Sequence, residues 1–345
     1  MISRCFRLHH TLTQYLIIFG SLVLFFIFYY FDGHRQLMES AIYVRDDWIK
    51  HESSAEQTYQ QDSSTSSFKS TCSASADRRG PRQNVIGYSM YGSNFSDQKF
   101  YNSYLKWFGE TLREIPIKYP GWVVRIYHEL KSDDVESWRV LNNVLDSGTI
   151  KSSRDHIDLC NATQVIRNRQ LGNIFEMTWR WLPLLDDMVD TFMSRDSDSA
   201  IISREEDSVR EWLASNKTFH IMRDHPYHDV FFLGGLWGVK INQERSAIAV
   251  TAEKMFHKNH LHKKGYDQEL LINYFQSMAV KSMIAHDSYC CGKFPGSQPF
   301  PTPRQNGWFV GWQRKPSAEL KIPCPENCRP HNLTGAAALA DWSLC

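Results

Sequence analysis

The chain has 345 residues and carries 39 Lys and Arg against 38 Asp and Glu, which leaves a formal net charge of +1. A balance this even argues against a nucleic-acid partner, because phosphate binding requires a surplus of basic side chains. From residue 84 onward apolar residues persist to the end of the chain, and that length is compatible with one large α/β domain.

The chain begins with a candidate membrane anchor. The run from Tyr15 to Phe31 is uncharged, apolar and close to the ~20 residues that a bilayer requires. A cleaved signal peptide is the alternative, but its apolar region is usually about 7–15 residues long and ends in small residues, whereas this run ends in aromatic ones. We expect a cytosolic tail over 1–14, a signal anchor over 15–31, and a single-pass type II membrane protein of the Golgi apparatus or endoplasmic reticulum.

The remainder of the chain fits the lumen of these compartments. Residues 32–83 form a polar stem, and 51–83 have so few aliphatic side chains that we expect disorder there. A folded domain is expected over 84–345. N-x-[ST] sequons, the acceptor sites for glycosylation, occur at Asn94, Asn161, Asn216 and Asn332.

Seven of the eight cysteines lie beyond the apolar run, where disulfide bonds are expected. Because seven is odd, one cysteine stays free or links two chains, and Cys72 in the polar stem predicts such a link in a homodimer. Cys324, Cys328 and His331 could also be zinc ligands, but half a zinc site in a secretory protein is more typical of disulfide chemistry.

Strand-like and helix-like patterns alternate through the domain, which predicts a mostly parallel sheet with ligands bound beyond the carboxyl ends of its strands. The expected strands are Val85–Met90, Trp122–Tyr127, Ile157–Cys160, Thr191–Arg195 and Phe219–Met222. The expected helices are Gln98–Ile115, ending before Pro116, then Asp133–Leu145, Leu171–Asp187 and Ser203–Ser215, the last with a capping box between Ser203 and Glu206.

Two aspartates, Asp196 and Asp198, follow the fourth of these strands in the segment SRDSDS. Where a strand gives way to a loop, carboxylates at i and i+2 can converge on one hard divalent cation. A solvated turn is the alternative, since Asp and Ser favour turns through hydrogen bonds to their own backbone.

The block from Trp179 to Lys240 resembles a poorly characterised group of glycosyltransferases with RFLP, SRDxDS, MRDHPxH and LGGMWG-like signatures. The resemblance covers about Val85 to Gly311 and implies a GT-A-type (nucleotide-diphospho-sugar transferase, Rossmann-like) domain. It further implies that Asp196 and Asp198 bind Mn²⁺ or Mg²⁺ and, through it, the diphosphate of a nucleotide-sugar donor. The implied function is metal-dependent transfer of the sugar to a glycan or glycoprotein acceptor.

The resemblance also suggests roles for two residues further along the chain. His286, at the end of a late apolar run, would be a third metal ligand, although a strand-end histidine also makes ordinary hydrogen bonds, and Asp287 is a neighbouring alternative. Asp267, at an expected helix start, would be the general base or an acceptor-binding acid, although a carboxylate there caps a helix regardless of catalysis.

The remaining candidates are contacts to the donor or acceptor. Gly234 and Gly235 offer backbone that a ligand can approach closely, and Trp237 offers an apolar platform for a sugar. Arg195 is the expected phosphate contact, with Arg180, Arg169 and Arg223 as further candidates. Asp224 is expected to contact the acceptor or the sugar.

Other functional classes remain as alternatives. A relative that binds glycans without catalysis would keep the fold, and a glycosidase would need two carboxylates across a sugar. A D-x-D phosphohydrolase is disfavoured because Ser199 and Ala200 replace the continuation expected for that class. An EF-hand-type calcium loop is excluded because Ala200 and Ile201 occupy positions that need a ligand and a glycine.

Overall fold

The computed structural model describes residues 69–92, 94–147, 154–314, 319–331, 333–335 and 340–345. All of them belong to one compact unit, Ser66–Cys345. The expected tail, the expected anchor, most of the polar stem and Asn332 lie outside the described residues. Among the residues that are described, no helix is both long enough and apolar enough to span a bilayer.

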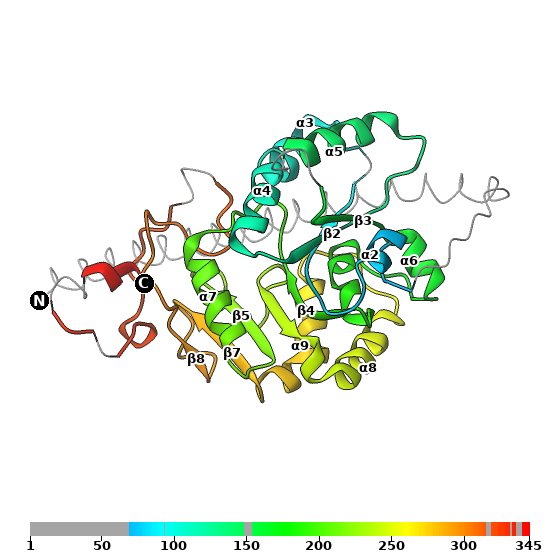
Figure 1. The fold of residues 1–345 in the computed structure, drawn as a ribbon. Helices are drawn as coiled ribbons and strands as arrows, with labels where there is room; N and C mark the ends of the chain where they lie inside the picture. The colour runs from blue at the N-terminus through cyan, green and yellow to red at the C-terminus, as the bar shows by residue number, and fades with distance from the viewer. Residues whose placement is uncertain (1–68, 93, 148–153, 315–318, 332, 336–339) are drawn as a thin grey trace, which may run out of the picture. The chain divides into compact units, whose positions relative to one another are not determined.

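A mostly parallel eight-stranded sheet forms the centre of this unit, which confirms the predicted α/β class (Figure 1). The strand order is β3-β2-β1-β4-β6-β5-β7-β8. Among these eight described strands, β6 alone runs antiparallel to its neighbours, β4 and β5. The strands are β1 Gln83–Met90, β2 Trp122–His128, β3 Ile157–Asn161, β4 Val189–Ser194, β5 Phe219–Arg223, β6 Trp237–Lys240, β7 Met283–Asp287 and β8 Ser297–Gln298.

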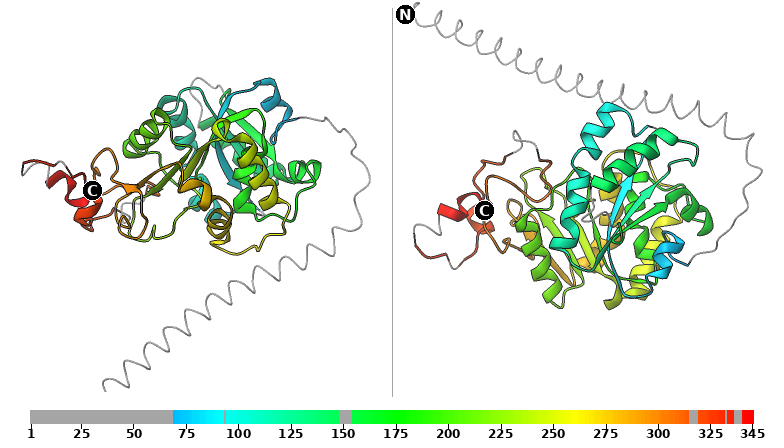
Figure 2. Two further views of the ribbon diagram at one scale, coloured as in Figure 1. Left: turned by 90° about the horizontal axis from the view of Figure 1, so that it is seen from below. Right: turned by 45° about the horizontal axis from the view of Figure 1, so that its top comes forward.

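Helices cover both faces of the sheet, so the central strands are buried on both sides (Figures 1 and 2). One face carries α4 (Phe108–Lys118), α5 (Val135–Ser147) and α7 (Ser203–Ala214). The other face carries α6 (Ala162–Asn168), α8 (Arg245–Phe256) and α9 (Tyr266–Ala279). Shorter helical elements are α2 Ala74–Arg78, α3 Gln98–Phe100, a π-helical turn Tyr101–Leu105, and 3₁₀ segments Glu176–Leu185, Ile241–Gln243, Glu326–Cys328 and Trp342–Leu344.

Alternation along β1 assigns its side chains to two hydrophobic cores. Val85 packs with Trp181, Trp237 and other residues beside α8 and α9. Ile86 and Tyr88 pack on the opposite face beside α4, α5 and α7. A period of two along a strand produces this division, because successive side chains point to opposite faces of the sheet.

Helix α4 does not end before Pro116 as predicted, because it continues to Lys118 with Pro116 inside its last turn. Proline lacks the N–H that would bond the carbonyl four residues earlier, here that of Leu112. His156 Nε2 lies 3.1 Å from this carbonyl oxygen and replaces the missing donor. A side chain from a distant loop therefore makes the proline tolerable.

Two other helix predictions need correction. The segment predicted as a helix over Leu171–Asp187 is instead a 3₁₀ segment, Glu176–Leu185, preceded by α6, which was not predicted. Pro183 lies inside the 3₁₀ segment. Ser203 begins α7 as expected, but Ile202 precedes it as the cap and no side chain caps this helix, so the predicted capping box is wrong.

The folded unit begins earlier than the expected stem boundary at residue 83. The Ser70 hydroxyl and the Thr71 backbone N–H each donate a 2.8 Å hydrogen bond to Asp186, which lies just before β4. Cys72 forms a disulfide with Cys160 in β3. The expectation that Cys72 links two chains is therefore wrong, because its sulfur is bonded to a cysteine of the same chain.

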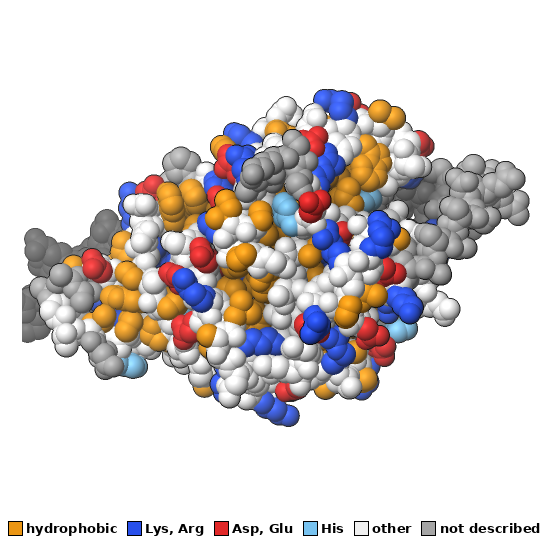
Figure 3. All heavy atoms as spheres, in the orientation of Figure 1, with side chains coloured by type: hydrophobic (Ala, Val, Ile, Leu, Met, Phe, Trp, Pro, Cys, Tyr) orange, Lys and Arg blue, Asp and Glu red, His pale blue; other side chains and the backbone are white. Residues whose placement is uncertain are grey.

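Two further disulfides, Cys291–Cys328 and Cys324–Cys345, hold the end of the chain. They exclude Cys324 and Cys328 as zinc ligands, because both sulfurs are bonded to other cysteines. The free thiol among the described residues is Cys290. Three disulfides suit an oxidising compartment. On the face shown in Figure 3, acidic and basic side chains are interspersed.

Candidate functional site

The candidate site lies where the direction of the sheet changes. The chain runs from β1 to β2 and β3 on one side, then returns to place β4 on the other side of β1. In open α/β sheets such a reversal leaves a crevice at the carboxyl ends of the two strands. Asp196 follows the last residue of β4, Ser194, by two positions, so the D-x-D motif lies at the carboxyl end of a strand as the sequence predicted, at the point where such a crevice is expected.

Three charged side chains from distant elements meet beyond the carboxyl end of β4. Arg180, from the 3₁₀ segment that crosses β1, forms an ion pair through Nη1 with the Asp196 carboxylate. Its Nη2 lies 3.4 Å from Oδ2 of Asp267 at the start of α9. The side chains of Arg180 and Asp267 are buried, whereas that of Asp196 is 40% exposed. One buried guanidinium therefore holds two carboxylates, of which only Asp196 faces solvent.

The two predicted glycines are the residues that allow this approach. A Cβ on Gly235 would lie 2.1 Å from Oδ2 of Asp196, and a Cβ on Gly234 would lie 2.1 Å from Oδ2 of Asp267. Neither distance is possible for real atoms, so any side chain would force the carboxylates away. Gly234 and Gly235 were expected to approach a ligand, and here they approach the two acidic residues instead.

Asp267 begins a helix as predicted, but it does not face solvent. The residue is 1% exposed, and its Oδ1 has no hydrogen-bond partner within the described part of the chain. Burial raises the pKa of this carboxyl, the nearby Asp196 charge raises it further, and Arg180 opposes both. An acceptor hydroxyl cannot reach Asp267 in this arrangement, so the geometry does not support its predicted role as the base.

The loop after β4 forms hydrogen bonds with the C-terminal region. The N–H of Ser199 donates to the carbonyl of Asp196 at 3.2 Å, which forms a tight turn. The Gln313 side-chain amide lies 2.5 Å from Oδ2 of Asp198, and the N–H of Ala200 donates to the Trp312 carbonyl at 2.9 Å. The D-x-D motif thus belongs both to a turn and to a contact between distant segments.

The side chains at this turn provide some of the ligands that a hard divalent cation needs. Asp196 and Asp198 supply carboxylate oxygens at a partly exposed position. The described residues include no third His, Cys, Asp or Glu that joins these two in a ligand cluster. Two protein carboxylates fit Mg²⁺ or Mn²⁺, which commonly complete their coordination with substrate phosphates and water.

His286 does not supply the predicted third ligand. It lies in β7, which β6 and β5 separate from β4 in the sheet order. Its side chain is fully buried, with Nε2 3.2 Å from the Glu211 carboxylate and Nδ1 2.9 Å from Nε2 of His220. Burial lowers the pKa of His286, while Glu211 acts in the opposite direction. The alternative of a strand-end histidine with ordinary hydrogen bonds describes it correctly.

Arg195 is not positioned to bind phosphate. Its Nε lies 2.7 Å from Oε1 of Glu205 on α7, and Nη1 donates to the carbonyls of Ser194 and Trp237. The residue is 3% exposed. Arg195 directly follows β4, and its side chain points into the interior, so the prediction from its place beside Asp196 fails.

Two predicted contacts to the sugar or acceptor also lie in the interior. Trp237 is fully buried and packs edge-on against Trp181, which excludes it as a platform for a ligand. Asp224 is fully buried between Arg204, at 3.1 Å, and Arg304, at 2.6 Å. Both arginines lower the pKa of this carboxyl against the effect of burial. Asp224 anchors the C-terminal segment and does not contact solvent.

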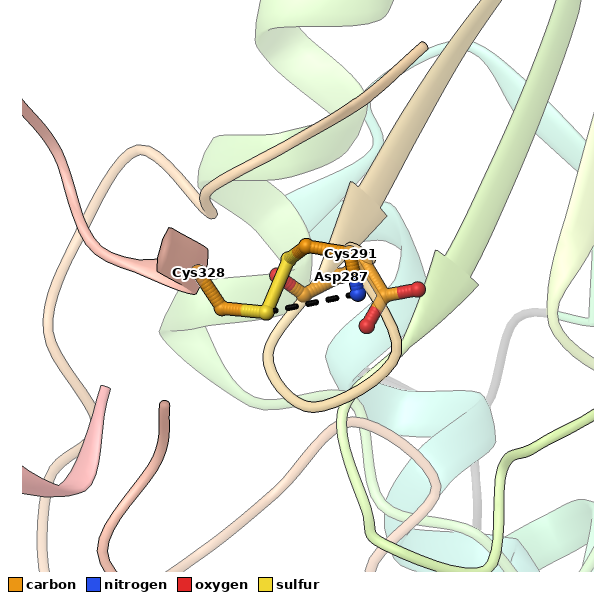
Figure 4. Close-up of side chains that lie close together, drawn as sticks. All are labelled: Asp287, Cys291 and Cys328. Carbon is orange, nitrogen blue, oxygen red and sulfur yellow. Dashed lines mark hydrogen bonds between the residues drawn. A yellow bond between two sulfur atoms is a disulfide. The ribbon is translucent and has the colours of Figure 1, made fainter. Parts of the chain in front are cut away.

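One cluster has the composition of a metal site but not its chemistry. Asp287, Cys291 and Cys328 lie close together beyond β7 (Figure 4). The two sulfurs form a disulfide, so neither is a thiolate. The Asp287 carboxylate is occupied by Arg223 at 2.6 Å and by backbone N–H groups of Tyr289 and Cys290. These partners leave no ligand set for an ion.

Two of the predicted glycosylation sites are exposed, at Asn94 and Asn216. Asn161 is half-buried, and its side-chain oxygen accepts a hydrogen bond from the N–H of Gln164 at the start of α6. The structure therefore presents Asn94 and Asn216 most openly for modification.

Sequence reasoning missed a cavity of about 480 Å³ beside the D-x-D loop. Three tryptophans contribute to its lining, Trp107, Trp308 and Trp312. The signal that could have found it is the repeated Gly-Trp pair in the segment GWFVGW, at residues 307–312. Gly307 and Gly311 have φ of 70° and 93°, values that favour glycine, and each is the third residue of a turn whose fourth residue is the following tryptophan.

No protein-family model matches the chain, and no curated protein matches it. What the site can do therefore follows from its own geometry: a partly exposed carboxylate after β4, a buried cation paired with it and an aromatic cavity beside the same loop.

Proposed function

We propose that this chain is a metal-dependent glycosyltransferase that moves a sugar from a nucleotide-sugar donor to a glycan or glycoprotein acceptor. In this proposal the domain is of GT-A type and lies in the lumen of the Golgi apparatus or endoplasmic reticulum, anchored by residues 15–31. The observation that carries the proposal is the position of Asp196, whose 40% exposed carboxylate follows β4 at the crevice where the strand order reverses.

Asp196 and Asp198 would hold the cation, Mn²⁺ or Mg²⁺. When bound, such a cation offsets the negative charge that a diphosphate leaving group gains as the glycosyl bond breaks. Arg180 orients the Asp196 carboxylate, and Gln313 orients that of Asp198. Both contacts reduce the motion of the ligands, and ligands held in place in this way bind a cation more tightly than mobile ones.

Asp267 has a different role in this proposal from the one expected of a base. Its carboxylate lies behind Gly234 and holds Nη2 of Arg180. It is therefore a positioning residue, which acts on Asp196 through Arg180. The acceptor is bound elsewhere, and the cavity lined by tryptophans beside the motif is the available space.

A specific observation favours a second candidate, a glycan-binding relative without catalysis. Arg180 already supplies a positive charge to Asp196, and Asp267 is closed to solvent. Because Arg180 already compensates the negative charge of Asp196, this carboxylate would bind a dication less strongly. The two candidates differ in one measurable property, the dependence of nucleotide-sugar binding on metal.

The test uses the full-length chain in detergent, screened against nucleotide sugars with Mn²⁺ or with EDTA by calorimetry and thermal stability. A true donor stabilises the protein by mass action, and we expect this only with Mn²⁺. D196N and D198N should each reduce donor affinity at least about tenfold, because Asn removes the charge that holds a dication but keeps the size of the side chain.

The matched control is D187N, an exposed aspartate at the opposite end of β4. It should bind the donor as wild type does. Equal donor affinity in wild type, D196N and D198N would refute the metal site. Glycan binding without any binding of nucleotide sugars would establish the second candidate instead.

A further inference from the structure

The cavity beside the D-x-D motif lies between three segments of the chain. Helix α4 forms one wall, residues 200–204 before and at the start of α7 form another, and residues 305–314 form the third. The backbone bond from Ala200 to Trp312 and the contact from Gln313 to Asp198 join it to the motif. Its volume of about 480 Å³ falls in the usual range for small-molecule pockets, about 300–1,000 Å³.

Aromatic rings form one side of this cavity. Trp308 and Trp312 are stacked with ring centroids 4.9 Å apart and an interplanar angle of 14°. Trp107, which precedes α4, is half-buried and contributes a third ring. Flat rings of this kind offer large apolar faces at fixed positions, suited to the C–H face of a sugar ring.

Charged side chains of α4 form the other side. Glu110, Glu114 and Lys118 are spaced four residues apart and therefore share one face of the helix. Arg314 bridges the two glutamates, at 3.5 Å from Glu110 and 3.2 Å from Glu114, and Lys118 lies 3.3 Å from Glu114. Two carboxylates and two cations thus compensate one another within this wall, and the third cation of the lining, Arg204, is paired with the buried Asp224 at 3.1 Å.

Arg314 is held in this wall by an unusual backbone. Its φ is 55°, in the left-handed region that residues with side chains rarely adopt. Its Nε is buried and has no hydrogen-bond partner within the described part of the chain. A strained conformation of this kind persists where the surroundings require it, which is common at ligand sites. The guanidinium is thereby kept on Glu110 and Glu114.

From these walls we infer that the cavity binds an uncharged saccharide unit. A phosphate or a sugar acid would meet two carboxylates, and a cationic ligand would meet Arg314 and Lys118. A neutral ring with many hydroxyl groups fits both walls of the cavity. Its C–H face packs on tryptophan, and its hydroxyl groups form hydrogen bonds with the Glu and Arg side chains. The inference that the cavity binds a saccharide does not depend on catalysis. The assignment of this saccharide as the acceptor rests on the proposed function.

The probes are methyl glycosides of glucose, galactose, mannose and N-acetylglucosamine, with lactose as a disaccharide. Uridine monophosphate and N-acetylneuraminic acid are the charged comparisons. Binding to the full-length chain is measured by saturation-transfer NMR and calorimetry, in a detergent without a sugar head group. We expect at least one neutral saccharide to bind and the sialic acid to bind at least about tenfold more weakly.

Three variants test the walls. W107A removes a half-buried ring, and E110Q/E114Q removes both carboxylates at nearly constant shape. Each should weaken saccharide binding at least about tenfold. W138A, at another half-buried tryptophan on α5, should leave it unchanged. Because E110Q/E114Q alters little volume, it keeps the test informative if W107A is unstable.

The proposal is wrong if no neutral saccharide binds, if charged probes bind better, or if W107A and E110Q/E114Q bind as wild type does. D196N and EDTA separate this inference from the proposed function. Both should weaken donor binding at least about tenfold and leave saccharide binding intact. If the wild-type protein with Mn²⁺ binds a saccharide but none of the nucleotide sugars, the transferase proposal is overturned and the saccharide site is retained.

Discussion

The guanidinium of Arg180 forms an ion pair with the carboxylate of Asp196 across 16 positions of sequence. The arginine side chain is 4% exposed and the aspartate side chain 40% exposed, so a buried cation fixes the direction of a carboxylate at the surface. Asp267 completes the arrangement from behind. The orientation of the D-x-D motif is therefore set by residues outside the motif.

R180Q should destabilise the protein by about 3–5 kcal/mol, because removing one partner leaves buried charge without compensation. Asp267 is the more affected carboxylate, since it is 1% exposed. The free energy of unfolding is measured by chemical denaturation in EDTA. In the double variant R180Q/D267N much of this loss should be recovered. Additive effects of the two substitutions would contradict the bridge.

G235A should disturb the site because the new methyl group would lie 2.1 Å from the Asp196 carboxylate. We expect at least a tenfold loss of Mn²⁺-dependent donor affinity with a smaller effect on folding. The control is G292A, where the nearest atom to the added Cβ is 3.6 Å away. Calorimetry with Mn²⁺ and the donor compares the two. Equal behaviour of both variants would show that the close approach is unimportant.

Removing the Cys72–Cys160 disulfide in C72S/C160S should cost up to about 4–5 kcal/mol, because the bond closes a loop of 88 residues in the unfolded chain. Denaturant titration measures the loss. Peptide mapping without reduction should recover these two cysteines as one pair from a monomer. C290S, which alters the free cysteine of the described residues, is the control. A covalent dimer that disappears in C72S would refute the assignment.

The stability of the domain should fall as the pH is lowered, with His128 as one cause. Burial lowers the pKa of His128 to about 4, and its Nδ1 accepts the N–H of Leu130 at 3.2 Å, which requires a neutral ring. Because the folded pKa lies below the ordinary 6.5, this contribution is present above pH 6.5 and is lost on acidification toward pH 4.

Between pH 7 and pH 5 this histidine should account for a loss of about 2 kcal/mol. H128N keeps an acceptor near the position of Nδ1 without titrating, so its free energy of unfolding should fall less over that interval. H257N, at an exposed histidine, is the control. An unchanged pH dependence in H128N would remove His128 as a cause.

The sequence predicted β1 to β5 because the burial of these strands produces apolar runs, whereas it did not predict β6 and β8 as strands. All of β5 is buried, and its apolar run alone predicts a strand at Phe219–Met222. Helix ends were less predictable where distant groups intervene. Nothing near Pro116 indicates that His156 would serve the carbonyl of Leu112, and nothing near Ser70 indicates that Asp186 would hold it.

In the candidate site, too, some features follow from the local sequence and others depend on the tertiary structure. The sequence determined that two aspartates follow a strand, because local chemistry selects those residues at such positions. Only the tertiary structure decided which side chains reach the crevice. Arg195 and Arg180 look alike in sequence, yet Arg195 turns inward to Glu205 while Arg180 reaches Asp196. Side-chain direction depends on sheet face and on contacts between segments far apart in the chain, and neither is encoded by a residue's immediate neighbours.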